Sequence, residues 1–222
     1  MPMDSLFSTL AAWDTALLYR INGDWTSPVL DRIMLAVSSP AFFTIPMILG
    51  SLAVAIWGGF RGRVFLVLLG LAIVLGDGVI DNWAKKAVHR PRPNEALEGV
   101  RIPEQVLDAQ GNRNGVFVHW AWPRAESGGR SFPSGHVLNN AALALLACTI
   151  WGRRRFAWVW AWTALVGYSR VYLGAHYPSD VVGSLLLALA YLSLFLLAAS
   201  AAWRGLAPKL APKLAAGHAE LY

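Results

Sequence analysis

Long apolar runs, separated by short and strongly basic turns, dominate this chain. Of its 222 residues, 56% are hydrophobic and only 14% are charged, whereas a soluble domain usually carries about a quarter charged residues. Runs of this length and composition are candidates for membrane-spanning segments. The sequence therefore predicts a multi-span membrane protein rather than a soluble one.

Five apolar runs are expected to cross the bilayer. The first contains Pro40 and Pro46, so we expect it to be kinked or entered through a short amphipathic lead. Residues 1–30 are too polar to span, but Leu10, Trp13 and their neighbours recur at helical spacing, which predicts an interfacial amphipathic helix. This segment lacks a basic start followed by an apolar core, so no signal peptide is expected. The five runs cover about 33–57, 64–83, 134–151, 156–172 and 180–203.

The rest of the composition excludes several classes of protein. No internal repeat or linker divides the chain, so we expect a single domain over residues 1–222. The one cysteine, Cys148, lies in an apolar run, which rules out a disulfide within one chain. The net charge of +6 is expected to reflect cytoplasmic loops, a site for an anion, or both. Nucleic-acid binding is not expected, because no basic stretch stands on a soluble module.

The basic residues of the short loops predict the orientation in the membrane, because such loops are mostly cytoplasmic. Counting the runs places all of these cations on one side, so the N-terminus, the long polar loop that ends at Phe132 and the turn at 173–179 should lie outside. The expected topology is N-out and C-in. The cations are Arg61, Arg63, Arg153, Arg154, Arg155, Arg204, Lys209 and Lys213.

Three polar clusters occur at membrane boundaries on the predicted outer face. The first, Lys85–Pro93, follows the second apolar run. The second, Pro133–His136, lies where the long loop meets the third run. The third begins with Ser169 and Arg170 and continues through His176 to Asp180, from the end of the fourth run to the start of the fifth.

The second cluster has the residue types of a helix start that binds an anion. Pro133 can occupy the first turn, where its missing N–H is not needed, and Ser134 can cap the helix. Gly135 lets another group approach the backbone closely. Free N–H groups at such a start bind phosphate, and His136 is placed to exchange a proton with the bound group.

Fixed positive charge comes from Lys85, Arg92 and Arg170. Arginine suits paired contacts with phosphoryl oxygens, and lysine acts as a point charge. Together with Ser134 and Gly135, these residues are expected to hold a phosphoryl group.

Two histidines, His136 and His176, can divide the roles of acid and nucleophile. Asp180 lies one helical turn after His176, where a carboxylate can accept the Nδ1–H and leave Nε2 free to attack. Taken singly, such a cation can be an interfacial anchor, such a histidine a structural group and Asp180 a helix cap. The meeting of three clusters on one face favours a site. No cluster has the ligand density of a metal site, so neither a metal nor a cofactor is expected.

Neighbouring residues have less specific roles. Asp77, Asp81 and Lys85 share one helix face, so Asp81 is expected to position Lys85, although the two carboxylates could also pair structurally. Asn139 and Asn140 are expected to support the site or to join helices. The remaining candidates are Lys86 and Arg90 for an anionic headgroup, Trp120 and Trp122 for the interface, and His89, His119 and His218 as structural or solvated groups.

The three clusters together resemble the three-part signature of the type 2 phosphatidic acid phosphatase (PAP2) superfamily, in order and without a departure. The resemblance implies an all-α, integral membrane helical bundle. Here we expect about five transmembrane helices plus the N-terminal interfacial helix, whereas many membrane members have six spans. The matching motifs are Lys85-x6-Arg92-Pro93, Pro133-Ser134-Gly135-His136 and Ser169-Arg170-x5-His176-x3-Asp180.

The resemblance also implies roles for these residues in a metal-independent hydrolysis of phosphate esters. It implies that His176 attacks phosphorus and forms a phosphohistidine, that Asp180 orients His176, and that His136 protonates the leaving oxygen. The residues implied to hold the phosphoryl oxygens are Lys85, Arg92, Ser134, Gly135 and Arg170.

The function expected from these features is that of a membrane phosphatase acting on a lipid phosphate or diphosphate at the extracytoplasmic face, in a bacterial inner membrane. Candidate substrates are undecaprenyl diphosphate, phosphatidylglycerol phosphate, phosphatidic acid and lipid A phosphate. One alternative is a lipid phosphotransferase, in which a lipid hydroxyl replaces water. Another is a non-catalytic lipid-binding or transport protein, against which the intact histidines argue. The vanadium haloperoxidases share the signature, but they are soluble.

Overall fold

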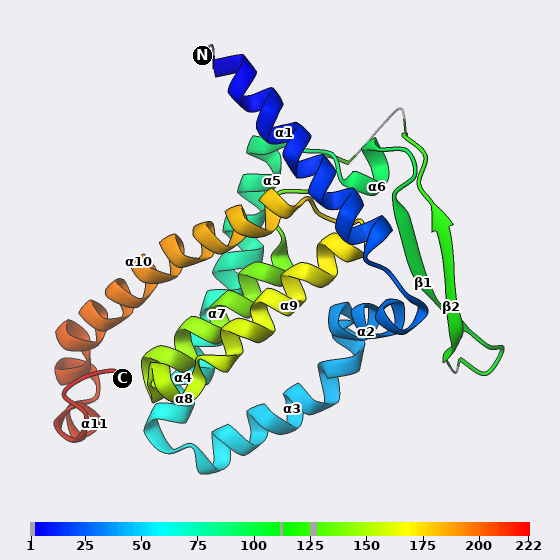
Figure 1. The fold of residues 1–222 in the computed structure, drawn as a ribbon. Helices are drawn as coiled ribbons and strands as arrows, with labels where there is room; N and C mark the ends of the chain where they lie inside the picture. The colour runs from blue at the N-terminus through cyan, green and yellow to red at the C-terminus, as the bar shows by residue number, and fades with distance from the viewer. Residues whose placement is uncertain (1–2, 112, 125–127) are drawn as a thin grey trace.

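The computed structural model describes residues 3–111, 113–124 and 128–222. Helices dominate, and a two-stranded sheet lies beside one end of the helical bundle (Figure 1). The predicted all-α membrane bundle is confirmed, with this hairpin as an addition. The elements are α1 (Met3–Tyr19), η1 (Arg20–Asp24, π-helical), α2 (Pro28–Ser38), α3 (Pro40–Trp57), α4 (Gly59–Leu75), η2 (Gly76–Asp81, π-helical), α5 (Asn82–Val88), α6 (Pro93–Ala96), β1 (Arg101–Leu107), β2 (Arg113–Trp120), α7 (Gly135–Trp151), α8 (Arg153–Phe156), α9 (Trp158–Tyr172), α10 (Pro178–Leu210) and α11 (Pro212–Gly217).

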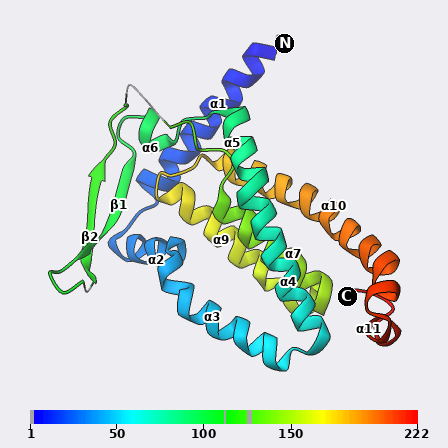
Figure 2. The ribbon, with the colours of Figure 1, turned by 180° about the vertical axis from the view of Figure 1, so that it is seen from behind.

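Helix α7 is the centre of the bundle, and α4, α9 and α10 all pack against it (Figures 1 and 2). Its buried side is rich in alanine, including Ala141, Ala142 and Ala147. Small residues allow helix backbones to approach closely, which is how helices associate where lipid removes the hydrophobic driving force. Leu138 and Leu146 of α7 are fully buried in this core.

All five apolar runs predicted to span the membrane are helical. Among the described residues, three helical stretches are long and apolar enough to cross a bilayer: Pro40–Trp57, Gly59–Ala96 and Pro178–Leu210. Helix α7 is apolar but has 17 residues, about 25 Å against a hydrocarbon core of about 30 Å. The predicted break in the first run is confirmed, because the non-helical residue Ser39 separates α2 from α3.

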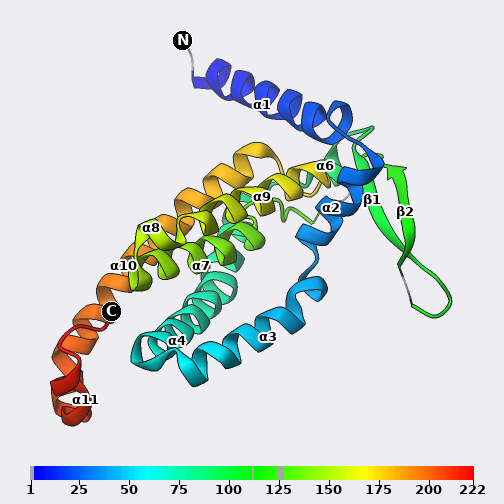
Figure 3. The ribbon, with the colours of Figure 1, turned by 60° about the horizontal axis from the view of Figure 1, so that its bottom comes forward.

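Helix α3 stands away from the rest of the bundle (Figure 3). None of its residues is buried, and large apolar side chains such as Ile45, Met47 and Leu49 are more than half exposed. An exposed apolar surface of this kind is typical of a membrane-interacting face. We interpret α3 as a lipid-facing span.

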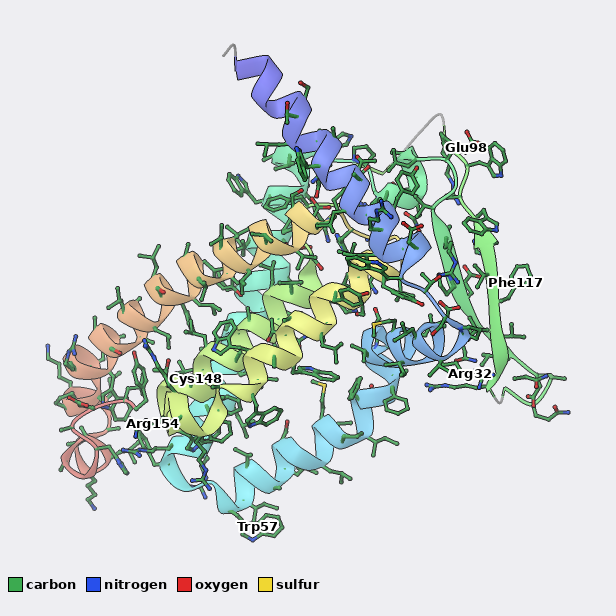
Figure 4. All side chains as sticks on the ribbon, in the orientation of Figure 1. Arg32, Trp57, Glu98, Phe117, Cys148 and Arg154 are labelled. Carbon is green, nitrogen blue, oxygen red and sulfur yellow. The ribbon has the colours of Figure 1, made fainter. Side chains whose placement is uncertain are left out.

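The two ends of the bundle differ in chemistry. The α3–α4 turn, α8 and α11 lie at one end, and α5, α6 and the first turn of α10 lie at the other (Figure 1). Figure 4 shows Trp57 and Arg154 at the first end and Glu98 and Phe117 at the second. The basic short turns and the three motifs therefore lie at opposite ends, as the sequence predicted.

The long polar loop contains a β-hairpin that the sequence analysis did not predict. Strands β1 and β2 are antiparallel, with Arg101 opposite Trp120. The side chain of Asn22 joins this hairpin to α9, because its amide donates to the carbonyls of Arg101 (2.9 Å) and Tyr172 (2.7 Å). Arg101 also forms an ion pair of 3.1 Å with Asp31 of α2. The hairpin is thereby fixed beside the motif end of the bundle.

Candidate active site

The structure brings the three motifs together at one end of the bundle, around His176. This histidine lies between α9 and α10 and is 3% exposed. Burial and the nearby positive charges of Arg170 and Arg92 lower the pKa of His176 to about 3. His136 is also close enough to contribute to this shift. His176 is therefore neutral at physiological pH, which is the state that a nucleophile needs.

The hydrogen-bond partner of His176 differs from the predicted one. Nδ1 of His176 lies 2.5 Å from the backbone carbonyl oxygen of Ser131, and Asp180 contacts Ser131 instead, accepting from its Oγ at 2.5 Å. The prediction that Asp180 accepts a hydrogen bond directly from His176 is therefore wrong. Because a carbonyl oxygen can only accept, Nδ1 carries the proton and Nε2 presents a lone pair.

Asp180 is only 1% exposed and bonds to several parts of the site. Its carboxylate accepts hydrogen bonds from Ser131 Oγ, from Arg90 at 2.7 Å and from the backbone N–H of Tyr177 at 2.9 Å. The last bond caps the start of α10, which confirms the capping alternative. Ser131 therefore links Asp180 to His176 by one hydrogen bond to each.

Three side-chain donors that were predicted to bind phosphate are buried without a hydrogen-bond partner among the described residues. They are Nε of Arg92, Nε of Arg170 and the hydroxyl of Ser134. Helix α7 begins at Gly135, so Pro133 precedes it and Ser134 is its N-cap residue, but the Ser134 side chain makes no capping bond. The prediction that Pro133 lies in the first turn is wrong, whereas Ser134 occupies the predicted N-cap position with its hydroxyl left available to a ligand.

Lys85 and Gly135 lie on one side of the site with two carboxylates. Lys85 forms an ion pair of 2.6 Å with Asp81, as predicted. A Cβ atom added to Gly135 would lie 3.5 Å from Asp77 Oδ1 and 3.8 Å from Asp81 Oδ1, which places the pair beside the start of α7. Both carboxylates belong to the π-helical segment η2, a feature that often marks functional positions. Asp77 also accepts a hydrogen bond of 3.0 Å from Asn139.

His136 and Arg170 share a partner, Ser38, that the sequence analysis missed. Nε2 of His136 lies 3.3 Å from the carbonyl oxygen of Ser38, and Arg170 donates to the Ser38 hydroxyl. The carbonyl acceptor implies that Nε2 of His136 carries a proton. Ser38 is the last residue of α2 and is buried, so the end of α2 forms a wall of the site.

Four residues of this arrangement had no predicted contact in the site: Asp14, Ser38, Arg90 and Ser131. Ser131 adjoins the Pro133–His136 motif, a position that could have singled it out, whereas Asp14 and Ser38 carry no local signal. Arg90 was expected to recruit a headgroup, but it contacts Asp180 and Asp14. Over residues 3–111, 113–124 and 128–222, no group of three or more His, Cys, Asp or Glu side chains could hold a metal ion.

The fold and the site define a helical membrane protein with a neutral histidine and unpaired cationic donors at one end. The model of the PAP2 superfamily matches residues 64–204, which is more than half of the chain. This protein belongs to the PAP2 superfamily, as its motifs predicted.

Curated relatives match at moderate identity. Phosphatidylglycerophosphatase B of Escherichia coli is 32% identical over 142 residues, which are 54% of this chain and 54% of that protein. Lipid A 4'-phosphatase of Bacteroides thetaiotaomicron is 30% identical over 175 residues, with 76% and 69% covered. Undecaprenyl-diphosphatase BcrC of Bacillus subtilis is 30% identical over 163 residues, with 72% and 70% covered. The chain thus spans about half the length of the first of these relatives.

Two solved structures share the fold. The crystal structure of LpxE from Aquifex aeolicus superposes with a TM-score of 0.58 at 24% identity, covering 82% of this chain and 93% of that one. A transmembrane PAP2-type phosphatidylglycerolphosphate phosphatase from Bacillus subtilis gives a TM-score of 0.54 at 20% identity, with 84% of each chain covered. At these identities the likeness supports the membrane bundle alone.

Proposed function

We propose that this protein is a metal-independent phosphatase that hydrolyses a membrane lipid phosphate or lipid diphosphate through a phosphohistidine. The observation that carries the proposal is the set of buried, unpartnered donors of Arg92, Arg170 and Ser134 beside the neutral His176. Buried donors without partners are costly and rare in folded proteins. A phosphoryl group would supply the missing acceptors.

In the proposed reaction, Nε2 of His176 attacks phosphorus and the bond from phosphorus to the leaving oxygen breaks. His136, acting as the imidazolium, donates its Nε2 proton to that oxygen and is left neutral. Water then attacks the phosphohistidine, the P–N bond breaks, phosphate leaves, and the proton of the water returns to His136. Proton and phosphoryl transfers balance over the two steps.

Fixed charges would stabilise the five-coordinate phosphorus. Arg92 and Arg170 can each offer N–H groups to its oxygens, and Lys85 can add a charge while still held by Asp81. The N–H groups of Gly135 and His136 stand at the start of α7, where helix donors have no partner within the helix. A bound phosphoryl group would replace Ser38 as the partner of Arg170.

The position of the site supports a lipid substrate. It lies at one end of a bundle that exposes apolar side chains on α3, so a headgroup can enter while the acyl or prenyl chains stay in the bilayer. The names of the relatives suggest phosphatidylglycerol phosphate, lipid A phosphate and undecaprenyl diphosphate, and phosphatidic acid is a fourth candidate. The basic turns at the opposite end favour a site on the outer side of a bacterial inner membrane.

Phosphate release from these four lipids, measured with purified protein in detergent containing EDTA, tests the proposal. We expect release from at least one lipid and none from the His176→Ala variant. Loss of the phosphoryl group from the lipid that requires an added lipid alcohol, with the group appearing on that alcohol, would identify a phosphotransferase instead. Lipid binding without any release or transfer would identify a non-catalytic protein and refute the proposal.

A further inference from the structure

The helix α1 contributes one buried carboxylate to the neighbourhood of the active site. Leu10, Trp13 and Leu17 of this helix are between 44% and 73% exposed, but Asp14 is only 8% exposed. Its Oδ1 accepts from the backbone N–H of Ser179 at 2.8 Å, and its Oδ2 accepts from the Ser179 hydroxyl at 2.5 Å and from Arg90 Nη2 at 2.6 Å. Asp14 therefore ties α1 to the start of α10 by polar contacts, next to the fully buried Leu18 of α1, which packs in one apolar cluster with Tyr177.

Arg90 connects Asp14 to Asp180. One guanidinium nitrogen donates to Asp14, and the other donates to Asp180 at 2.7 Å and to the Ser179 hydroxyl at 2.8 Å. The guanidinium also lies 3.9 Å from the centre of the Tyr177 ring. Charge-assisted contacts on two sides fix a planar group in one orientation. The position of Asp180 therefore depends on how Arg90 is held.

A second connection runs through the backbone. The first N–H groups of a helix lack partners within it, and a carboxylate near a helix start is stabilised by these N–H groups and by the helix dipole. Asp14 supplies such a carboxylate to Ser179, in the first turn of α10. Asp180 is the next residue, and through Ser131 it holds Nδ1 of His176.

We propose that Asp14 is a positioning residue for the reaction: by holding Arg90 and Ser179 it fixes the Asp180–Ser131–His176 arrangement, so that the docking of the membrane-surface helix α1 sets the rate of phosphoryl transfer. This inference rests on the function proposed above. Asp14 lies outside the residues that the PAP2 model matches, 64–204. In this proposal the N-terminal helix α1 helps to position the residues of the active site.

The variant Asp14→Asn tests this inference with little change in shape. The amide oxygen of the variant can still accept a hydrogen bond from Ser179, but the substitution removes the negative charge that contacts Arg90. We expect kcat to fall about 10-fold, the lower end of the effect seen for groups that orient a metal-binding histidine. KM should change less than about twofold, because no phosphate-binding residue is altered. The loss should be equal for a lipid phosphate and for p-nitrophenyl phosphate, since both need the same nucleophile.

The matched control is Asp24→Asn, which makes the same change in an exposed pair with Arg20, where the Asp24 side chain is 56% exposed. This variant should keep the wild-type kcat. Ser179→Ala is a milder second variant, should Asp14→Asn fail to fold. A double-mutant cycle with Arg90→Lys adds a further test: if both residues act through one contact, the second change should add little to the first.

Hydrogen–deuterium exchange in peptides covering 173–184 provides a readout that needs no activity. We expect faster exchange there in Asp14→Asn than in Asp24→Asn. Unchanged kcat and unchanged exchange in Asp14→Asn and Ser179→Ala would overturn the inference. A raised KM for the lipid alone would overturn it too, because α1 would then serve substrate binding. A wild-type protein that releases no phosphate would refute the proposed function, and the exchange comparison would still decide whether Asp14 orders this turn.

Discussion

Removal of the Ser131 hydroxyl tests the indirect connection between Asp180 and His176. Ser131 holds both partners, with its carbonyl oxygen on Nδ1 of His176 and its hydroxyl on Asp180. Ser131→Ala keeps the carbonyl and deletes only the bond to the carboxylate. We therefore expect a variant that folds and binds substrate but holds its nucleophile less firmly.

The size of the effect follows from the bond that is lost. A hydrogen bond to a charged group contributes about 1.5–3 kcal/mol. If all of it is felt in the transition state, kcat falls about 10- to 150-fold, at about 1.4 kcal/mol per factor of ten. Asp180→Asn should cost more, because an amide nitrogen would face either Arg90 or the N–H of Tyr177, leaving a buried donor without its acceptor.

Single-turnover phosphate release in detergent, with folding checked by thermal unfolding, is the assay. Ser193→Ala is the control, since that hydroxyl lies on α10, the helix that carries Asp180, is exposed and bonds only the carbonyl of Leu189 among the described residues. The opposite pattern would refute the reasoning: a kcat within twofold of wild type for Ser131→Ala together with a loss of about 10⁴ for Asp180→Asn. The latter is the effect of removing an aspartate that contacts the histidine directly in serine proteases.

Four further outcomes are expected. Phosphate release should persist in EDTA and be inhibited by vanadate, and activity that a divalent ion must restore would contradict this. Rapid quench should trap acid-labile phosphate on His136→Ala but none on His176→Ala, and the reverse would exchange their roles. A reporter active only outside the cytoplasm should work near residue 110 and fail near 154. Because the pKa of His176 is lowered to about 3, the unfolded chain binds a proton that the native chain does not between pH 6.5 and 3. Stability should therefore fall by about 1.4 kcal/mol per pH unit below 6.5, with a smaller slope in His176→Gln, as unfolding at pH 7 and 5 would show.

The helices and the end of the bundle at which the three motifs meet could be predicted because each depends on local sequence. Apolar runs define helices, and basic turns define one end, so the remaining polar clusters had to meet at the other. The partners within the site could not be predicted in this way. Asp14 and Ser179 are 165 residues apart, and Ser38 reaches Arg170 across 132 residues. Such contacts depend on side-chain packing that no periodicity records.

The hairpin was missed for a related reason. Val116, Phe117 and Val118 favour a strand, but they lie in a loop whose charge and glycine content dominate its composition. The strands form because Asn22 and Asp31 provide partners for Arg101. A short two-stranded sheet is marginal by itself, so its existence depends on contacts with distant parts of the chain.

The distribution of carboxylates separates four cations that look alike in the sequence. Lys85 is paired with Asp81, and Arg90 lies between Asp14 and Asp180. Arg92 and Arg170 have no carboxylate partner in the parts of the chain that the structure describes, and each leaves a buried Nε without an acceptor. Burying an unpaired charge is costly, so a fold that neutralises two cations and leaves two beside a neutral histidine is best suited to a ligand that brings negative charge. We therefore expect Arg90 to serve as a part of the scaffold and Arg92 as a part of the proposed phosphate site, although one proline alone lies between them.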